Sequence, residues 1–363
     1  MDWQKTAAWG LIFVVIGGVA IWAYSFFWAP ESVATVSDKW TRSGHAAAES
    51  ESFTRWADDD PPAIPRACAK CHSMDGFLDY LGVDGSARQE VDNEVLGVSV
   101  VACRTCHNPT AQEMTTVTFP STTTVEEPTQ STNCMVCHQG RRSTEDVEAA
   151  VAGLEPDTVS DDLGFINVHY AIAAATLLGG DTQVGYQYPG RSYVGRFEHV
   201  EDYDTCIECH DAHSTFRNPN QCSPCHLSVV NEADLRQIRS SAVDYDGDGN
   251  IEEPVREEIL SFRETLYAAI QAYGAEVVGQ PITYDSGSSP YFYAGSEGEE
   301  LTFDDRYESW TPRLVKAAYN YHYSWSDGGA YVHNAEYVMQ LLYDSAEDLS
   351  EVVDVDLQAF TRP

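Results

Sequence analysis

Five copies of one short motif contain all ten cysteines and five of the eleven histidines of this 363-residue chain. In each copy two residues separate a pair of cysteines, and a histidine follows the second cysteine directly. The cysteines are Cys68, Cys71, Cys103, Cys106, Cys134, Cys137, Cys206, Cys209, Cys222 and Cys225, and the histidines are His72, His107, His138, His210 and His226. Such a motif offers two thiols for thioether bonds and one imidazole for a metal.

The CxxCH spacing is typical of the covalent attachment of c-type haem, with the histidine as the proximal ligand of the iron. A zinc site or a redox-active CxxC needs no histidine directly after the second cysteine. A disulfide framework would not place every cysteine three residues from another one. The sequence therefore predicts five covalently bound haem c groups and no disulfide bond.

The segment Cys206–His226 reads CIECHDAHSTFRNPNQCSPCH. It is similar to the doubled CxxCH motif of multihaem c-type cytochromes, in which a histidine closely follows the first motif and a second motif comes soon after. The resemblance extends roughly over residues 40–230. It implies a body outside the cytoplasmic membrane, because c-type haem is attached there.

Six histidines remain as candidates for the distal axial ligands: His45, His169, His199, His213, His322 and His333. His213 lies too close to His210 to reach the opposite face of the same haem, so we expect it to ligate a neighbouring one. His45 and His333 lie in segments that resemble distal-ligand segments of multihaem cytochromes. We prefer His333 to His322 as the fifth ligand, because His322 lies in the aromatic run YNYHYSW, where packing is the simpler explanation. Met74, close after His72, is interpreted as a packing residue.

The N-terminal region contains an uncharged stretch of 24 residues, Thr6–Ala29. At about 1.5 Å per residue a helix of this length can cross a bilayer core. The alternative is a signal peptide with a late cleavage site at residues 32–34. We expect an uncleaved helix that holds the chain to the cytoplasmic membrane in a single pass, with the haem-bearing body on the periplasmic or extracellular side.

Composition excludes two broad classes of protein. The formal charge is −36, which argues against binding to nucleic acid because the phosphate backbone needs a basic surface. Aromatic residues make up 11% of the chain, too many for an acidic disordered protein. The surplus of carboxylates over only four lysines is compatible with a high-salt setting and favours basic partners.

The predicted organisation has four parts. Residues 1–30 form the anchor, 31–60 a tether with a short helix, 61–227 a pentahaem domain rich in loops, and 228–363 a helical subdomain. The fold class is mainly α with extensive loops, and porphyrins supply much of the core of the haem domain. Apolar spacing predicts helices over residues 168–178, 252–275 and 334–349, and Thr311-Pro312 is a start signal for a further helix.

The segment DYDGDGNIE, residues 244–252, fits the front of a calcium-binding EF-hand loop. The expected glutamate at position 12 is replaced by Val255, so a longer form would use Glu257 or Glu258. The candidate calcium ligands are Asp244, Asp246, Asp248, Asn250 and Glu258. The alternative is a solvated acidic turn.

These features together predict an electron-transfer protein that is not an enzyme, because six-coordinate haem has no open position for a substrate. Its expected partners are redox proteins, either quinol-oxidising components or terminal reductases. One alternative is a multihaem reductase of nitrite or a sulfur oxyanion with one open haem. Another is a subunit of a cytochrome filament, in which a neighbouring subunit supplies a distal histidine. The sequence leaves open the redox potentials, the spatial order of the haems, the partner and the oligomeric state.

Overall fold

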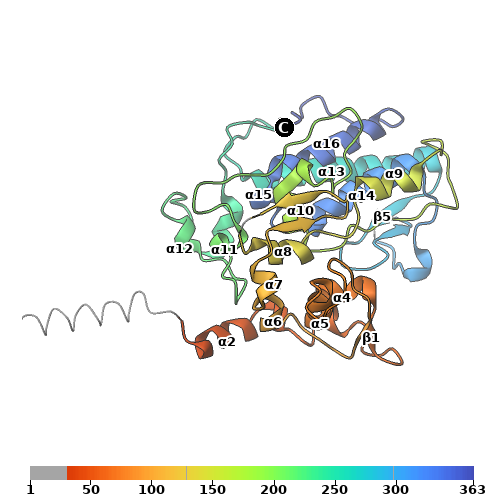
Figure 1. The fold of residues 1–363 in the computed structure, drawn as a ribbon. Coiled ribbons are helices and arrows are strands. Elements are labelled where there is room, and N and C mark those ends of the chain that lie inside the picture. Colours follow the sequence, from red (N-terminus) through yellow and green to blue (C-terminus); the bar gives the residue numbers. More distant parts are fainter. Residues whose placement is uncertain (1–30, 128, 297) are drawn as a thin grey trace, which may run out of the picture.

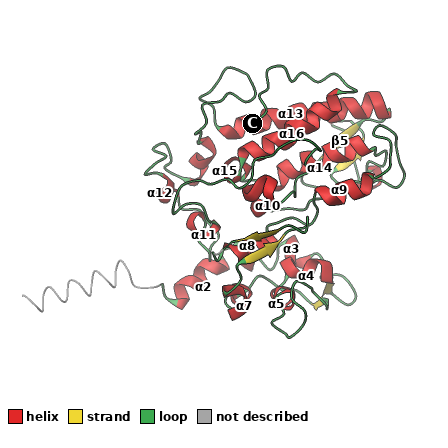
Figure 2. Cartoon of the chain, turned by 45° about the horizontal axis from the view of Figure 1, so that its top comes forward, coloured by secondary structure: helices red, strands yellow, loops and turns green. Residues whose placement is uncertain are grey.

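The computed structural model describes residues 31–127, 129–296 and 298–363, and its ribbon is rich in helices with little sheet (Figures 1 and 2). Within these residues, three two-stranded antiparallel sheets pair β1 with β2, β3 with β4 and β5 with β6. The strands are β1 (Ala63–Ile64), β2 (Val95–Leu96), β3 (Thr116–Thr118), β4 (Thr124–Glu126), β5 (Ile282–Tyr284) and β6 (Phe292–Ala294). The helices are α2 (Val33–Thr41), α3 (Glu51–Thr54), α4 (Arg66–His72), α5 (Met74–Tyr80), α6 (Cys103–Cys106), α7 (Pro109–Gln112), α8 (Ser131–Cys137), α9 (Thr144–Val151), α10 (Ala173–Leu178), α11 (Cys206–Cys209), α12 (Pro219–Cys222), α13 (Val255–Tyr273), α14 (Pro312–Ser326), α15 (Ala330–His333) and α16 (Ala335–Ser350). The expected class, mainly α with extensive loops, is thus confirmed.

The longest helices, α13, α14 and α16, pack together at one end of the molecule, and the short helices α4 to α7 lie at the other (Figure 1). Helix α13 follows the predicted pattern, with Ile259, Phe262, Leu266 and Ile270 buried on one face. It begins after Pro254 with Glu257 and Glu258 in its first turn, where acidic side chains favour a helix. This end of the molecule contains much of the apolar core.

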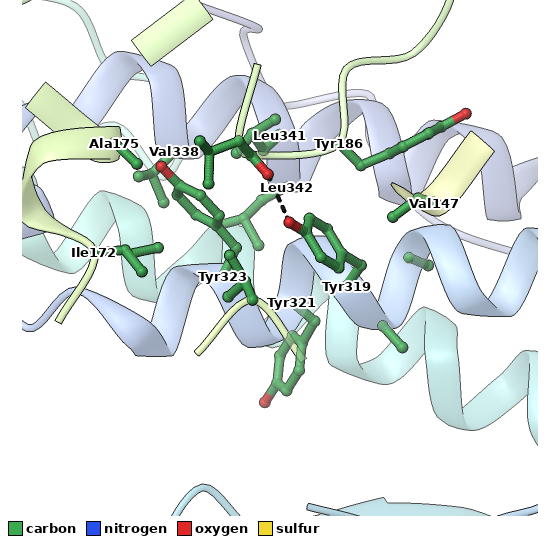
Figure 3. Packing of buried hydrophobic residues seen from close by; sticks show 14 of the residues in the cluster. Val147, Ile172, Ala175, Tyr186, Tyr319, Tyr321, Tyr323, Val338, Leu341 and Leu342 are labelled. Carbon is green, nitrogen blue, oxygen red and sulfur yellow. Dashed lines mark hydrogen bonds between the residues drawn. The ribbon is translucent and has the colours of Figure 1, made fainter. Parts of the chain in front are cut away.

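The tyrosines of α14 fill the space between the helices. Tyr319 and Tyr323 lie on one face of α14 with Leu341 and Leu342 of α16, and Tyr321 points to the other side (Figure 3). The Tyr319 hydroxyl donates to the carbonyl of Val184 at 2.7 Å. The segment around residue 184 therefore packs into the C-terminal core although it precedes residue 228 in the chain. The four-part division of the chain stays a prediction.

The predicted helix starts are accurate at the C-terminal end of the chain and less so elsewhere. Thr311 caps α14 by accepting a hydrogen bond from the Leu314 amide, and Asn334 caps α16. The helix expected over residues 168–178 is shorter, because it begins only at Ala173. His169 and Ala171 adopt positive φ angles of 84° and 54°, which an α-helix does not accommodate.

The expected single-pass membrane anchor requires a correction. In residues 31–127, 129–296 and 298–363, no helix is long and apolar enough to cross a membrane. This finding points against the predicted location in the cytoplasmic membrane. The stretch Thr6–Ala29, on which that prediction depended, lies outside the described residues.

Candidate functional site

Each CxxCH motif folds as a single helical turn. The amide of His138 donates to the carbonyl of Cys134 at 2.9 Å, and the amides of His107, His210 and His226 make the same bond to the first cysteine of their motifs at 2.8–2.9 Å. Residues three and four apart share one face of a helical turn. Both thiols and the imidazole of a motif can therefore contact the same planar group.

A cavity of ≈ 2630 Å³ is lined by residues of all five motifs. All ten cysteines and ten of the eleven histidines line it, and His322 does not. Divided by five, this volume is roughly 500 Å³ for each motif, within the range of about 300–1,000 Å³ typical of a ligand pocket. Apolar side chains on its wall complete a surface suited to porphyrin, among them Val33, Tyr170, Phe197, Val200, Ile207 and Val332.

Four motif histidines face a histidine from elsewhere in the chain. The ring centroids lie 5.9 Å apart in His72–His169, 6.1 Å in His107–His213, 6.4 Å in His138–His45 and 6.0 Å in His226–His199. Two imidazoles that share one iron have centroids about 6 Å apart, because each metal–nitrogen bond is about 2 Å long. The spacing therefore fits an iron between each pair.

The remaining motif histidine, His210 of the fourth motif, lies within electrostatic reach of His333. Burial is the main cause that lowers the pKa of His210, and His333 is one of the positive groups that lower it further. The structure thus brings the five motif histidines together with His45, His169, His199, His213 and His333. The pairing was absent from the sequence prediction, because the members of a pair are distant in the chain.

His322 occupies a different environment. Its Nδ1 contacts the Tyr284 hydroxyl at 2.8 Å and its Nε2 contacts Oδ1 of Asn167 at 3.1 Å. Burial lowers its pKa to about 4. Both ring nitrogens are engaged in the core, as the packing interpretation of the aromatic run predicts. Met74 begins α5, and the described wall of the cavity does not include it.

Hydrogen bonds at Nδ1 orient several of the cavity histidines. Nδ1 lies 2.6 Å from the carbonyl of Ser52 in His72, 2.8 Å from that of Ala171 in His138 and 3.0 Å from that of Thr215 in His210. A hydrogen bond to a carbonyl fixes the tautomer that leaves Nε2 free for a metal. No local sequence pattern predicts these backbone partners.

Burial also favours the neutral form of several of these imidazoles, because it lowers their pKa. It is the main cause that lowers the pKa of His45, His138 and His199, and together with Arg141 it lowers the pKa of His169 to about 4. A lower pKa keeps the ring neutral, which metal ligation requires. At His333 burial also works to lower the pKa, but the Asp327 carboxylate outweighs it and the pKa is raised.

Neighbouring motifs are in direct contact through their thiols. The thiol of Cys71 lies close to that of Cys137, and the thiol of Cys134 lies close to that of Cys206. The amide of Cys206 also donates to the Ser131 hydroxyl of α8 at 3.1 Å. The third motif therefore adjoins both the first and the fourth.

The acidic loop of residues 244–252 brings the Asp244, Asp246 and Asp248 carboxylates within 4.8 Å of one another. Asp246 forms a second such group with Glu253 and Glu258. Both oxygens of Glu258 are engaged, Oε2 by the amides of residues 245 and 246 and Oε1 by Arg239. The Asn250 side chain accepts a hydrogen bond from the amide of residue 252. The sequence reasoning missed Glu253, and calcium binding stays a prediction.

Curated proteins with similar sequences are polyhaem cytochromes. The chain is 24% identical over 413 residues to the C-type polyheme cytochrome OmcB of Geobacter sulfurreducens, an alignment that covers 95% of this chain and 51% of that protein. It is also 24% identical over 417 residues to the C-type polyheme cytochrome OmcC of the same organism, with 96% and 50% covered. The chain thus spans about half the length of the curated relatives it matches. No family model and no solved structure matches.

The similarity to these proteins supports the interpretation of this chain as a multihaem c-type cytochrome.

Proposed function

We propose that the chain binds five haem c groups, each iron between two histidines, and that it serves in electron transfer rather than in catalysis. The observation that carries the proposal is the cavity lined by every cysteine and by ten of the eleven histidines. The similar proteins OmcB and OmcC are both named C-type polyheme cytochromes, which supports haem c as the cofactor of this chain.

Four of the proposed axial pairs follow from the ring contacts, and the fifth joins the two cavity histidines that remain, His210 and His333. The first three motifs take His72 with His169, His107 with His213 and His138 with His45, and the last two take His210 with His333 and His226 with His199. This assignment uses all ten cavity histidines. His333 is assigned rather than His322, because both ring nitrogens of His322 are already engaged by Tyr284 and Asn167.

When bound, haem supplies an iron that changes between the ferric and ferrous states by one electron. The residues of the chain hold that iron and control its surroundings. The thiols would hold each porphyrin covalently, the paired imidazoles would ligate its iron, and backbone carbonyls orient three of the rings through Nδ1. Two filled positions leave no site for a substrate, which favours electron transfer over a reductase activity.

Contacts between motifs support transfer within the chain. The thiol contacts Cys71–Cys137 and Cys134–Cys206 bring the first, third and fourth attachment sites together. His213 follows the fourth motif closely and faces His107 of the second. His199, just before the fourth motif, faces His226 of the fifth. Each proposed haem site therefore adjoins at least one other.

The partners we propose are redox proteins with basic surfaces. The chain carries a formal charge of −36 before the haem propionates are added, so a basic docking surface would be attracted to it. With these pairs no iron would need a histidine from a neighbouring subunit, so the filament is not required to complete the ligation.

Intact-protein mass spectrometry and electron paramagnetic resonance test the proposal. The full chain produced with haem attachment should exceed its polypeptide mass by five haems, and the oxidised protein should give only low-spin ferric signals. A different number of haems would refute the five-site assignment. A high-spin signal, or a spectral shift on addition of nitrite or cyanide, would favour the reductase instead.

A further inference from the structure

His333 differs from the other cavity histidines in its hydrogen-bond partner. Its Nδ1 lies 2.7 Å from Oδ2 of Asp327. The Nδ1 atoms of His72, His138 and His210 contact backbone carbonyls instead. Within the described residues, His333 is the histidine that forms an ion pair with a carboxylate.

Asp327 is held in place by its surroundings. It follows α14 directly, and its side chain is only 5% exposed. Its second oxygen, Oδ1, accepts a hydrogen bond from the Gly329 amide at 2.9 Å, and its backbone carbonyl accepts one from Ala330 at 3.2 Å. The negative charge of this carboxylate is thus fixed beside the ring of His333 and has little access to water.

The loop between α14 and α15 fits closely around the imidazole. A Cβ atom on Gly329 would lie 2.6 Å from Cε1 and 3.0 Å from Nδ1 of His333. Any larger residue at position 329 would displace the ring. Asp327, Gly328, Gly329 and His333 all line the cavity, so the loop and the imidazole form one wall of it.

We propose that Asp327 is a positioning residue which, through His333, lowers the reduction potential of the iron bound at the fourth motif. This inference rests on the proposed ligation of that iron by His333 and His210. A carboxylate that accepts the Nδ1 proton increases the electron density of the imidazole and makes it a stronger ligand. Its buried negative charge also stabilises the ferric state, which carries one more positive charge than the ferrous state.

The two effects have the same sign, so the direction of the shift does not depend on their relative size. The redox step is the reversible gain of one electron by the iron, and the proton between Nδ1 and Oδ2 stays where it is. Backbone carbonyls, which carry only partial charge, support the irons of the first and third motifs. The charge of Asp327 also reaches His138 of the third motif, but its direct hydrogen bond is to His333, so the largest shift is expected at the fourth site.

The test is Asp327→Asn in the full chain with its haems attached. Asparagine keeps the shape and an acceptor oxygen but removes the charge. We expect the ferrous-to-ferric ratio of one haem at a fixed potential to rise about tenfold, which is about 59 mV for one electron. Spectroelectrochemical titration measures this shift, and the low-spin g values of one haem in electron paramagnetic resonance should change with it.

Asp344→Asn is the matched control. Asp344 is also buried and paired with a cation, Arg362, at 2.7 Å, but it does not line the cavity. This variant should lose stability and keep all five potentials. Five unchanged potentials in Asp327→Asn would overturn the inference. If that variant fails to take up five haems, Asp327→Ser also removes the charge and must raise the same potential, and five unchanged values would again overturn the inference.

A variant of the ligand itself distinguishes this inference from the proposed function. His333→Ala should convert one haem to a high-spin form. If it does so while Asp327→Asn changes nothing, the ligation stands and the role of Asp327 is wrong. If His333→Ala keeps five low-spin haems, the proposed ligation by His333 is wrong.

Discussion

The imidazole rings of His107 and His213 face each other across the cavity, with centroids 6.1 Å apart and planes only 8° apart. His213 follows His210 by three residues, yet it faces the histidine of the second motif. The Asp211 carboxylate supports this arrangement, because it accepts hydrogen bonds from the amides of His213 and Ser214 and pairs with Lys39 at 2.8 Å.

Replacing His213 should therefore affect the haem of the second motif. In His213→Ala we expect one of five haems to become high-spin and to bind cyanide, because its iron loses one axial ligand. Resonance Raman and electron paramagnetic resonance detect the change. Combining His213→Ala with Cys103→Ala and Cys106→Ala identifies the haem, since removal of the second attachment site should abolish the high-spin signal. If that signal persists, His213 serves another haem.

His322 should be a structural residue. In His322→Phe two partly buried groups, Asn167 Oδ1 and the Tyr284 hydroxyl, each lose a hydrogen bond to a buried imidazole. We expect a loss of about 1–3 kcal/mol in the free energy of unfolding, measured by denaturant titration, with five low-spin haems retained. Loss of a low-spin signal would instead make His322 an axial ligand. His333→Ala, which should produce a high-spin haem, is the matched comparison.

A buried ion pair joins α13 to the segment before the acidic loop. Nη2 of Arg239 lies 2.6 Å from Oε1 of Glu258, and these side chains are 7% and 0% exposed. Glu258→Gln would leave Arg239 without its counter-charge, so we expect a loss of about 3–5 kcal/mol in the free energy of unfolding. Glu264→Gln, on an exposed position of the same helix, should change it by less than about 0.5 kcal/mol. Equal effects of the two variants would contradict this role.

Calcium binding by the acidic loop is tested with the chain depleted of calcium by a chelator. If Asp244, Asp246 and Asp248 bind the ion, added calcium at 100 times its Kd should stabilise the fold by about 2.7 kcal/mol, seen as a rise in Tm. Magnesium at the same ionic strength is the control. In Asp248→Asn the calcium-dependent rise should shrink. An unchanged Tm would identify the segment as a solvated acidic turn.

Local sequence was enough to predict the cofactor chemistry of this protein. A CxxCH motif carries both thioether positions and one axial ligand within a single helical turn, so its function depends on local geometry alone. The caps of α14 and α16 and the buried face of α13 were predictable for the same reason, since they depend on residues within a few positions of each other.

Tertiary structure decided which histidine faces which. His45 and His138, or His210 and His333, are distant in the chain, and no local pattern relates them. Folding also decided the difference between His322 and His333, because one ring is enclosed by Tyr284 and Asn167 while the other lines the cavity. The contact of Asp327 with His333 depends on the path of a glycine loop around an imidazole. Burial and long-range packing, which these contacts need, are properties of the folded chain.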